Sequence, residues 1–547
     1  MLFPTLSFAV FFVIVLPVSW LLLERRTWWR LFMVAASWFF YGCAGWGFVP
    51  LLIGSTVVNH AFAFAIDRND GRQRVWLVRA AVVVNLAVLG WFKYIGFLSS
   101  STSSLLDDLG LGLHVPVPKA LLPAGISFFT FQALSYVIDV YRRKLRPVTL
   151  LDFAVYLSFF PHLLSGPIVR ASEFLPQIRR RIDPRRVDAG RGLWLIGRGL
   201  FKKVVISSYM ASQAADPLFN FPHQHGGIEA LFGIYAYAIQ IYADFSGYTD
   251  IAIGLALLLG VRFPQNFDVP YTARSLHEFW RRWHMTLSRW LRDYLYIPLG
   301  GNRRGSRRTY VNLMATMVLG GLWHGAAWTF VAWGALHGAG LVGGRLRVAH
   351  RSRRMLGRDG EDLAQPELVA GGVTAALWRA PRHVWPRAPR CVPAAGLDGG
   401  GGEPVLRQPV LRWAVAQRVR DWSDHFEDRW SRRVAIPRRL RPAMAWLFTF
   451  NFVCLGWVFF RATSFANALT VLGRLFTWGP TPLDPVVALV VVAALAVQFV
   501  PARCSATLVA HFSRWRLPAQ VAALALTLVV IDVWGPAGVT PFIYFRF

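Results

Sequence analysis

The feature that most constrains this chain is the recurrence of long stretches without a charged residue. They lie at 1–23, 31–66, 120–138, 309–344, 442–460 and 485–502. A helix needs roughly 20 mostly apolar residues to cross the hydrocarbon core, so the runs 31–66 and 309–344 can each hold two crossings. The sequence therefore predicts an all-α polytopic membrane protein with about ten to thirteen membrane segments.

Composition and charge agree with this prediction. Hydrophobic residues make up 55% of the chain and charged residues only 16%. The net charge of +30 is concentrated in loops such as 25–30, 68–79 and 142–146, where Lys and Arg mark the cytoplasmic side. We expect a multi-pass plasma-membrane protein with its N-terminus outside, in contact with the lipid bilayer and without affinity for nucleic acid.

Two segments depart from simple spans. The run 153–169 contains Pro161, Gly166 and Pro167. Proline breaks the helical hydrogen-bond ladder, and broken backbone persists at membrane depth only where protein or a polar cavity satisfies it. We expect a re-entrant segment or broken helix there. The segment 262–308 is dense in aromatic residues and Arg, which predicts interfacial amphipathic helices.

The stretch 345–441 differs from both of its flanks. It is rich in Arg, Gly, Ala and Pro, and it has no span-length apolar run. This composition is typical of a basic, partly disordered loop. We therefore expect a first transmembrane part at 1–344, an insertion or cytoplasmic loop at 345–441, and a C-terminal transmembrane part at 442–547.

Several catalytic and metal-binding patterns are missing. The four cysteines form no CxxC pair, and neither HExxH nor HxxxH occurs, so we expect no disulfide framework and no metal. A GxSxG elbow and a GxxxxGK[ST] phosphate loop are also missing from the sequence. If the segment around 276–290 is one helix, His277 lies on the same face as His284, but no third ligand follows at a familiar spacing.

His324 is the main candidate for chemistry, because it lies well inside the uncharged run 309–344. An ionisable side chain at membrane depth is costly and is by default a functional candidate. Its neighbours Gly320, Gly321 and Gly325 leave room beside the imidazole. The alternative is a histidine that packs between helices and binds a backbone carbonyl.

A second polar group contains Asp244, Ser246 and Tyr248, between apolar stretches. Carboxylates near membrane depth usually pair with a base or line a polar path. The alternative for Asp244 is that it caps a helix or binds Arg residues of the segment 262–308.

Six motifs together resemble one family. They are PAGISFFTFQ at 123–132, FFPH with SGPI at 159–168, YADFSGY at 242–248, FWRRWH at 279–284, YIPLGGN at 296–302 and GLWHG at 321–325. In this order they are similar to the membrane-bound O-acyltransferase family, in the branch of the alginate O-acetyltransferases and the D-alanyl transfer protein of teichoic acid modification. The resemblance covers residues 1 to about 345 and resumes from about 442.

The resemblance implies a central reaction chamber with His324 as the catalytic histidine and His284 as a second histidine. Imidazole suits proton removal near neutral pH, so we expect His324 to be the general base. His284 is expected to orient the acceptor or to stabilise the oxyanion. The residues expected to line the chamber or bind substrate are Asp244, Ser246, Tyr248, Trp280, Trp283, Trp323 and Asn302.

The implied function is a membrane O-acyltransferase without a bound cofactor. It is expected to move a small acyl group, acetyl in the first instance, from cytoplasmic acetyl-CoA or another thioester toward hydroxyl groups of an exported polysaccharide. An extracytoplasmic transferase or carrier protein is an expected partner. Two alternatives stay open: a lipid O-acyltransferase with a long-chain donor, and a non-enzymatic transporter with Asp244 and His324 on its path.

Overall fold

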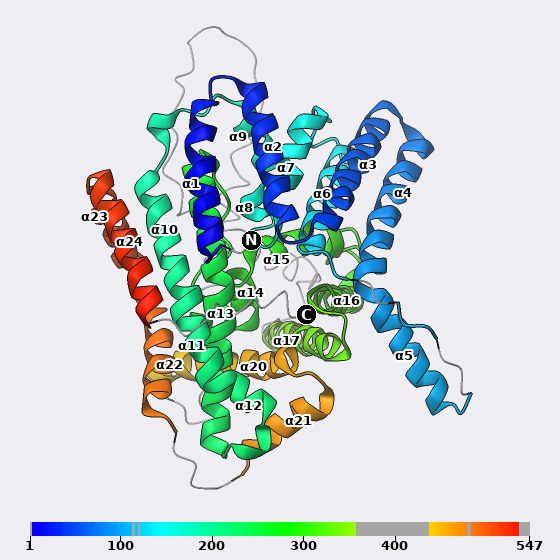
Figure 1. The fold of residues 1–547 in the computed structure, drawn as a ribbon. Helices are drawn as coiled ribbons and strands as arrows, with labels where there is room; N and C mark the ends of the chain where they lie inside the picture. Colours follow the sequence, from blue (N-terminus) through cyan, green and yellow to red (C-terminus); the bar gives the residue numbers. More distant parts are fainter. Residues whose placement is uncertain (1–2, 112–114, 119–120, 357–436, 478–482, 535–547) are drawn as a thin grey trace, which may run out of the picture.

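The computed structural model describes residues 3–111, 115–118, 121–356, 437–477 and 483–534 (Figure 1). The regular structure in these ranges is helical, and no strand occurs among them. The predicted all-α class is therefore confirmed. Short 3-10 segments connect longer helices at η1 (Trp46–Phe48), η3 (Pro184–Arg186), η6 (Pro222–Gln224), η7 (Pro270–Thr272) and η9 (Arg438–Leu440).

The N-terminal part is a series of apolar helices. They are α1 (Leu6–Leu21), α2 (Arg26–Gly42), α3 (Val49–Arg68), α4 (Gly71–Leu89), the π-helical segment η2 (Gly90–Tyr94) and α5 (Ile95–Asp108). Thr5 begins α1 because its side chain accepts a hydrogen bond from the backbone N–H of Phe8. The uncharged run 31–66 holds two helices, α2 and α3, as predicted.

Three helical stretches in the described ranges are long and apolar enough to cross a membrane: Trp46–Arg68, Gly71–Asp108 and α20 (Arg441–Arg461). A further apolar pair, α22 (Pro485–Val497) and α23 (Ala502–Ser513), is bent by 90° at its break. Shorter apolar helices include α1, α6 (Ile126–Tyr141) and the Leu517–Val529 part of α24 (Leu517–Trp534). The molecule is a helical membrane protein, and the number of ten to thirteen crossings stays a prediction.

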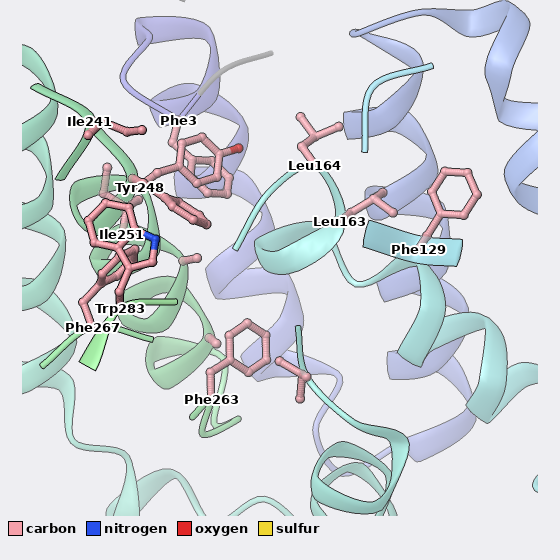
Figure 2. Close-up of a cluster of buried hydrophobic side chains, with 14 of the residues drawn as sticks. Phe3, Phe129, Leu163, Leu164, Ile241, Tyr248, Ile251, Phe263, Phe267 and Trp283 are labelled. Carbon is pink, nitrogen blue, oxygen red and sulfur yellow. The ribbon is translucent and has the colours of Figure 1, made fainter. Parts of the chain in front are cut away.

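The run 153–169 is a broken helix, as predicted. It folds into α7 (Leu150–Ser158), α8 (Phe160–Leu163) and an extended stretch that leads to α9 (Ala171–Arg179). Side chains satisfy the freed backbone groups: the Ser37 hydroxyl accepts from the N–H of Phe160 at 3.2 Å, and the Thr286 hydroxyl accepts from Ile168 at 3.0 Å. Figure 2 shows buried side chains around this segment, among them Leu163, Leu164 and Phe263. Protein groups thus replace the missing helical hydrogen bonds.

Helices α10 (Ala189–Leu200) and α13 (Gly227–Leu258) run side by side (Figure 1). A Cβ atom on Gly199 would lie 2.5 Å from the carbonyl oxygen of Gly247, and one on Gly254 would lie 2.6 Å from that of Gly192. The glycines of each helix are seven residues apart and so share a face. Small residues let membrane helices approach this closely. After α10 come η4 (Phe201–Ser207), α11 (Ser208–Met210), η5 (Ala211–Ala215) and α12 (Asp216–Asn220).

Besides η7, the segment 262–308 forms α14 (Leu276–Arg282), α15 (Met285–Leu291) and η8 (Arg292–Tyr296) before α16 begins at Gly305. The side chains of Phe279, Trp280 and Trp283 are buried. The uncharged run 309–344 then forms two helices, α16 (Gly305–His324) and α17 (Trp328–Leu356). Helix α17 continues past residue 345, where the loop was expected to start, as far as Leu356. Residues 357–436 of that predicted loop lie outside the described ranges.

The C-terminal part packs against the same core. It contains α20, α21 (Phe465–Arg474), α22, α23 and α24. Two indole N–H groups of α20 donate to Tyr271: that of Trp446 to its carbonyl oxygen at 2.7 Å and that of Trp457 to its hydroxyl at 3.1 Å. These contacts join α20 to the chain segment that leads into α14. The three-part division of the chain stays a prediction.

Candidate active site

His324 is the last residue of α16, and its side chain is only 4% exposed. Aromatic rings surround its imidazole: the ring centroids of Trp323, Trp333 and Phe460 lie 5.0, 5.2 and 5.3 Å away. Trp333 comes from α17 and Phe460 from α20. Three helices therefore enclose this histidine in an aromatic shell.

Two residues of η2 hold the end of α16 in place. The Lys93 ammonium donates to the carbonyl oxygens of Trp323 and His324 at 2.5 and 3.1 Å, and the Tyr94 hydroxyl donates to that of Leu322 at 2.8 Å. The last carbonyls of a helix have no partner within the helix, and a cation is favourable there. Lys93 and Tyr94 thus fix the position from which His324 projects.

His284 lies between two short helices, with a positive φ of 42° that separates α14 from α15. Its imidazole is fully buried, and its Nδ1 lies 3.1 Å from Oδ1 of Asn266. The backbone turn at His284 means that α14 and α15 are not one helix. The condition under which His277 would share a helical face with His284 is therefore not met. No cluster of three potential metal ligands occurs in the ranges that the structure describes.

The structure brings His284 and His324 together. Their ring centroids are 6.4 Å apart, and Trp323 lies 6.1 Å from His284. This spacing is longer than a direct hydrogen bond between two imidazoles requires. Phe245 of α13 packs edge-on against His284 at 4.6 Å and closes that side.

The other predicted residues lie at different distances from this pair. Trp280 packs on Trp333 at 5.7 Å and Trp283 on Trp457 at 4.9 Å, so Trp280 packs on a ring that itself contacts His324. Asn302 is exposed, in the turns after η8. Of the predicted tryptophans, Trp323 is in contact with both histidines, and Asn302 is not part of the buried cluster.

The polar residues of α13 belong to a buried ion network with α10 and η4. Lys203 forms an ion pair with Asp244, with side chains 2% and 3% exposed. Asp250 binds Arg198 at 2.7 Å and Lys202 at 2.8 Å, and Lys202 also reaches the hydroxyl of Ser246 at 3.3 Å. The ion-pair partner seen for Asp244 is Lys203 of η4, which lies outside the segment 262–308.

Tyr248 follows Asp244 by four residues and so lies on the same side of α13. Its ring stacks on Phe3 with 4.5 Å between centroids, as Figure 2 shows. Asp244, Ser246 and Tyr248 are therefore all buried, but the contacts seen for them lead to η4 and to the N-terminus. The residue of this stretch that touches His284 is Phe245.

Comparison with known proteins identifies the family. The model of the membrane-bound O-acyltransferase family matches residues 119–359, which include all six motifs. A probable alginate O-acetylase AlgI of Pseudomonas putida is 35% identical over 462 residues, which cover 83% of this chain and 76% of the relative. A peptidoglycan O-acetyltransferase of Helicobacter pylori is 34% identical, with 81% and 73% covered. The chain belongs to the membrane-bound O-acyltransferase family.

Membership of this family is supported by a further relative with higher identity over a shorter length. The probable alginate O-acetylase AlgI of Pseudomonas aeruginosa is 44% identical over 333 residues, which cover 60% of this chain. The match spans 63% of the relative's length, which is less than two thirds. The family model includes both histidines and Asn266 but not Lys93.

Sequence reasoning missed four residues around the histidines: Lys93, Tyr94, Asn266 and Thr286. Lys93 carried a usable signal, because it is the single charged residue between 80 and 106 and ionisable groups at membrane depth mark functional sites. Asn266 and Thr286 carried none, since the contacts of Asn266 with His284 and Thr286 depend on the turn between α14 and α15.

Proposed function

We propose that this chain is a multi-pass plasma-membrane O-acyltransferase. It moves a small acyl group, acetyl in the first instance, from a cytoplasmic thioester toward hydroxyl groups of an exported polysaccharide. The observation that carries this proposal is the pair His284 and His324, buried 6.4 Å apart inside an aromatic shell. Family membership, with relatives named as alginate and peptidoglycan O-acetyltransferases, supports the same reaction class.

The proposed reaction transfers an acyl group from the sulfur of a thioester to the oxygen of a hydroxyl group. The hydroxyl oxygen attacks the thioester carbonyl carbon, its proton passes to an imidazole, the C–S bond breaks, and the leaving thiolate takes the proton. His324 is the expected general base. His284 is expected to orient the acceptor or to stabilise charge on the carbonyl oxygen. The chain itself needs no bound cofactor for these steps.

The aromatic shell supports acyl transfer over hydrolysis. Trp323, Trp333 and Phe460 surround His324, and Phe245 covers His284. A site that excludes water protects a reactive thioester from wasteful hydrolysis. Acetyl-CoA is the proposed donor, and an extracytoplasmic transferase or carrier protein is the proposed partner that receives or positions the acyl group.

Inside-out membrane vesicles from the source cells test this proposal, because they expose the cytoplasmic face. The vesicles receive labelled acetyl-CoA or labelled palmitoyl-CoA, and the label is counted in polysaccharide, protein and lipid. The expected result is label from acetyl-CoA in polysaccharide or protein, and its loss with His324→Ala at equal chain level. Label from palmitoyl-CoA in lipid, or no label from either thioester, would overturn it in favour of the lipid enzyme or the transporter.

A further inference from the structure

Asn266 lies beside His284 and is itself fully buried. Its Oδ1 atom lies 3.2 Å from the backbone nitrogen of Thr286, 2.8 Å from the Thr286 hydroxyl and 3.1 Å from Nδ1 of His284. A backbone N–H can only donate a hydrogen bond. The side-chain atom of Asn266 that faces Thr286 must therefore be the oxygen and not the amide nitrogen.

This oxygen fixes the state of the neighbouring imidazole. An amide oxygen has no proton to give, so the His284 nitrogen that faces it must carry the ring proton and donate. A neutral imidazole has one N–H, and a buried histidine without a charged partner is neutral because an unpaired buried charge is costly. With the proton on Nδ1, Nε2 holds a lone pair.

The network continues beyond Asn266. The Thr286 hydroxyl accepts from the backbone N–H of Ile168 at 3.0 Å, so its own proton is left for Oδ1 of Asn266. The other amide atom of Asn266, Nδ2, lies 3.5 Å from the hydroxyl of Thr249 on α13. The donors from the broken helix and from α15, and the acceptor on α13, all agree with one orientation of Asn266.

Nε2 of His284 is buried and makes no hydrogen bond to any residue that the structure describes. The rings packed on His284 are those of Phe245, Phe267, Trp323 and His324. His324 is the titratable group among them. Lys93 binds carbonyl oxygens at the end of α16, and Asp244 beside Phe245 pairs with Lys203. A buried acceptor in this position calls for a donor from the substrate.

We propose that Asn266 is a positioning residue that holds His284 in one tautomer, so that its Nε2 accepts a hydrogen bond from a hydroxyl group of the acyl acceptor. This rests on the proposed function and deepens it. His284 was expected either to orient the acceptor or to stabilise the oxyanion, and this geometry favours the first of these roles. A neutral His284 has no second N–H to give to the carbonyl oxygen of the donor.

Two substitutions of Asn266 separate positioning from a purely structural role. Asn266→Ala removes the acceptor of the Nδ1 proton, and the transfer rate per folded chain is expected to fall about 100-fold. Asn266→Asp keeps an acceptor but adds a negative charge beside the imidazole. That charge stabilises the protonated ring, so His284 gains its second proton at a higher pH.

The decisive measurement is the pH dependence of the transfer rate. Transfer requires Nε2 of His284 and the base His324 to be unprotonated, so the rate falls on the acid side as either imidazole gains a proton. Asn266→Asp is expected to move this acid limb upward by about one pH unit or more while keeping transfer at alkaline pH. The matched control is Thr249→Val, which removes the hydroxyl beside Nδ2 and leaves all contacts of Oδ1, and its profile is expected to match wild type.

The assay uses the same vesicles with labelled acetyl-CoA between about pH 5 and pH 9, with rates normalised to folded chain. An acid limb that stays in place in Asn266→Asp would overturn the inference, as would a wild-type rate in Asn266→Ala. If Asn266→Ala does not accumulate, the comparison of Asn266→Asp with wild type still decides. Failure of the proposed function has a different signature, because wild type then transfers no label at any pH.

Discussion

Two buried regions of this molecule differ in what surrounds their ionisable side chains. Between η4 and α13, Lys203 pairs with Asp244, so that opposite charges compensate each other. Where the start of α15 lies near the end of α16, aromatic rings surround His284 and His324, and the neutral amide of Asn266 binds His284. Buried charge is tolerated when it is paired, whereas a neutral imidazole can keep a nitrogen for a substrate. The first region joins helices, and the second is suited to chemistry.

The largest expected difference between the regions is in activity. His284→Ala is expected to lower the transfer rate at least about 100-fold, because it removes the group that orients the acceptor. The matched control is His162→Ala, since His162 is equally buried and binds the carbonyl oxygen of Tyr156 at 2.9 Å, but phenylalanine rings surround it and His324 is not among its neighbours. That variant is expected to lose stability and to keep its rate per folded chain. Equal rate losses in both variants would remove the distinction.

The next effect concerns stability in the ion network. Asp244→Asn leaves the buried ammonium of Lys203 without its ion-pair partner, and this is expected to lower the free energy of unfolding by about 3–5 kcal/mol. Thermal unfolding of the purified chain in detergent measures the loss. The double variant Lys203→Met/Asp244→Leu removes both charges and is expected to regain most of it. A single variant as stable as wild type would show that the pair does not hold these helices.

A smaller effect on the transfer rate is expected at Lys93, whose ammonium binds the end of α16 beside His324. Lys93→Met removes the donor to the carbonyl oxygens of Trp323 and His324, and each hydrogen bond from a charged group contributes about 1.5–3 kcal/mol. We expect the transfer rate to fall about 10-fold because the end of α16 loosens. The exposed Lys144 offers the control Lys144→Met, and initial rates at matched chain level compare the two. Equal rates in both variants would mean that Lys93 does not position His324.

The smallest effect is expected at the surface. Arg181 and Glu24 form an ion pair at 3.0 Å, with side chains 68% and 81% exposed. Such pairs contribute little because water and salt screen them. Arg181→Ala is therefore expected to leave both the unfolding temperature and the transfer rate unchanged. A clear shift in either would require a role for this pair that its exposure does not explain.

The sequence predicted those features that have a local signal. Proline and glycine in the run 153–169 predicted its broken helix, and an ionisable residue inside an uncharged run singled out His324. The positive φ of His284 has no such signal, because a left-handed conformation is unusual for a residue other than glycine. Without it, α14 and α15 can be read as one helix, which would place His277 on the face of His284.

Contacts between distant segments could not be predicted either. Lys93 reaches the end of α16 from 230 residues away in the chain, and Lys203 meets Asp244 from 41 residues away. In both cases the partner depends on how two helices pack, which hydrophobic periodicity does not determine. The sequence therefore predicted which residues are unusual, and the structure was needed to show what each of them contacts.

The central claim is that His324 acts in acyl transfer to an exported polysaccharide. The most direct test measures ester-linked acetate on that polysaccharide in a deletion strain complemented with wild type or with His324→Ala at matched membrane levels. The account predicts that wild type restores acetate and that His324→Ala does not. Acetate restored equally by both would contradict the role of His324, and acetate restored by neither would contradict the proposed acceptor or acyl group.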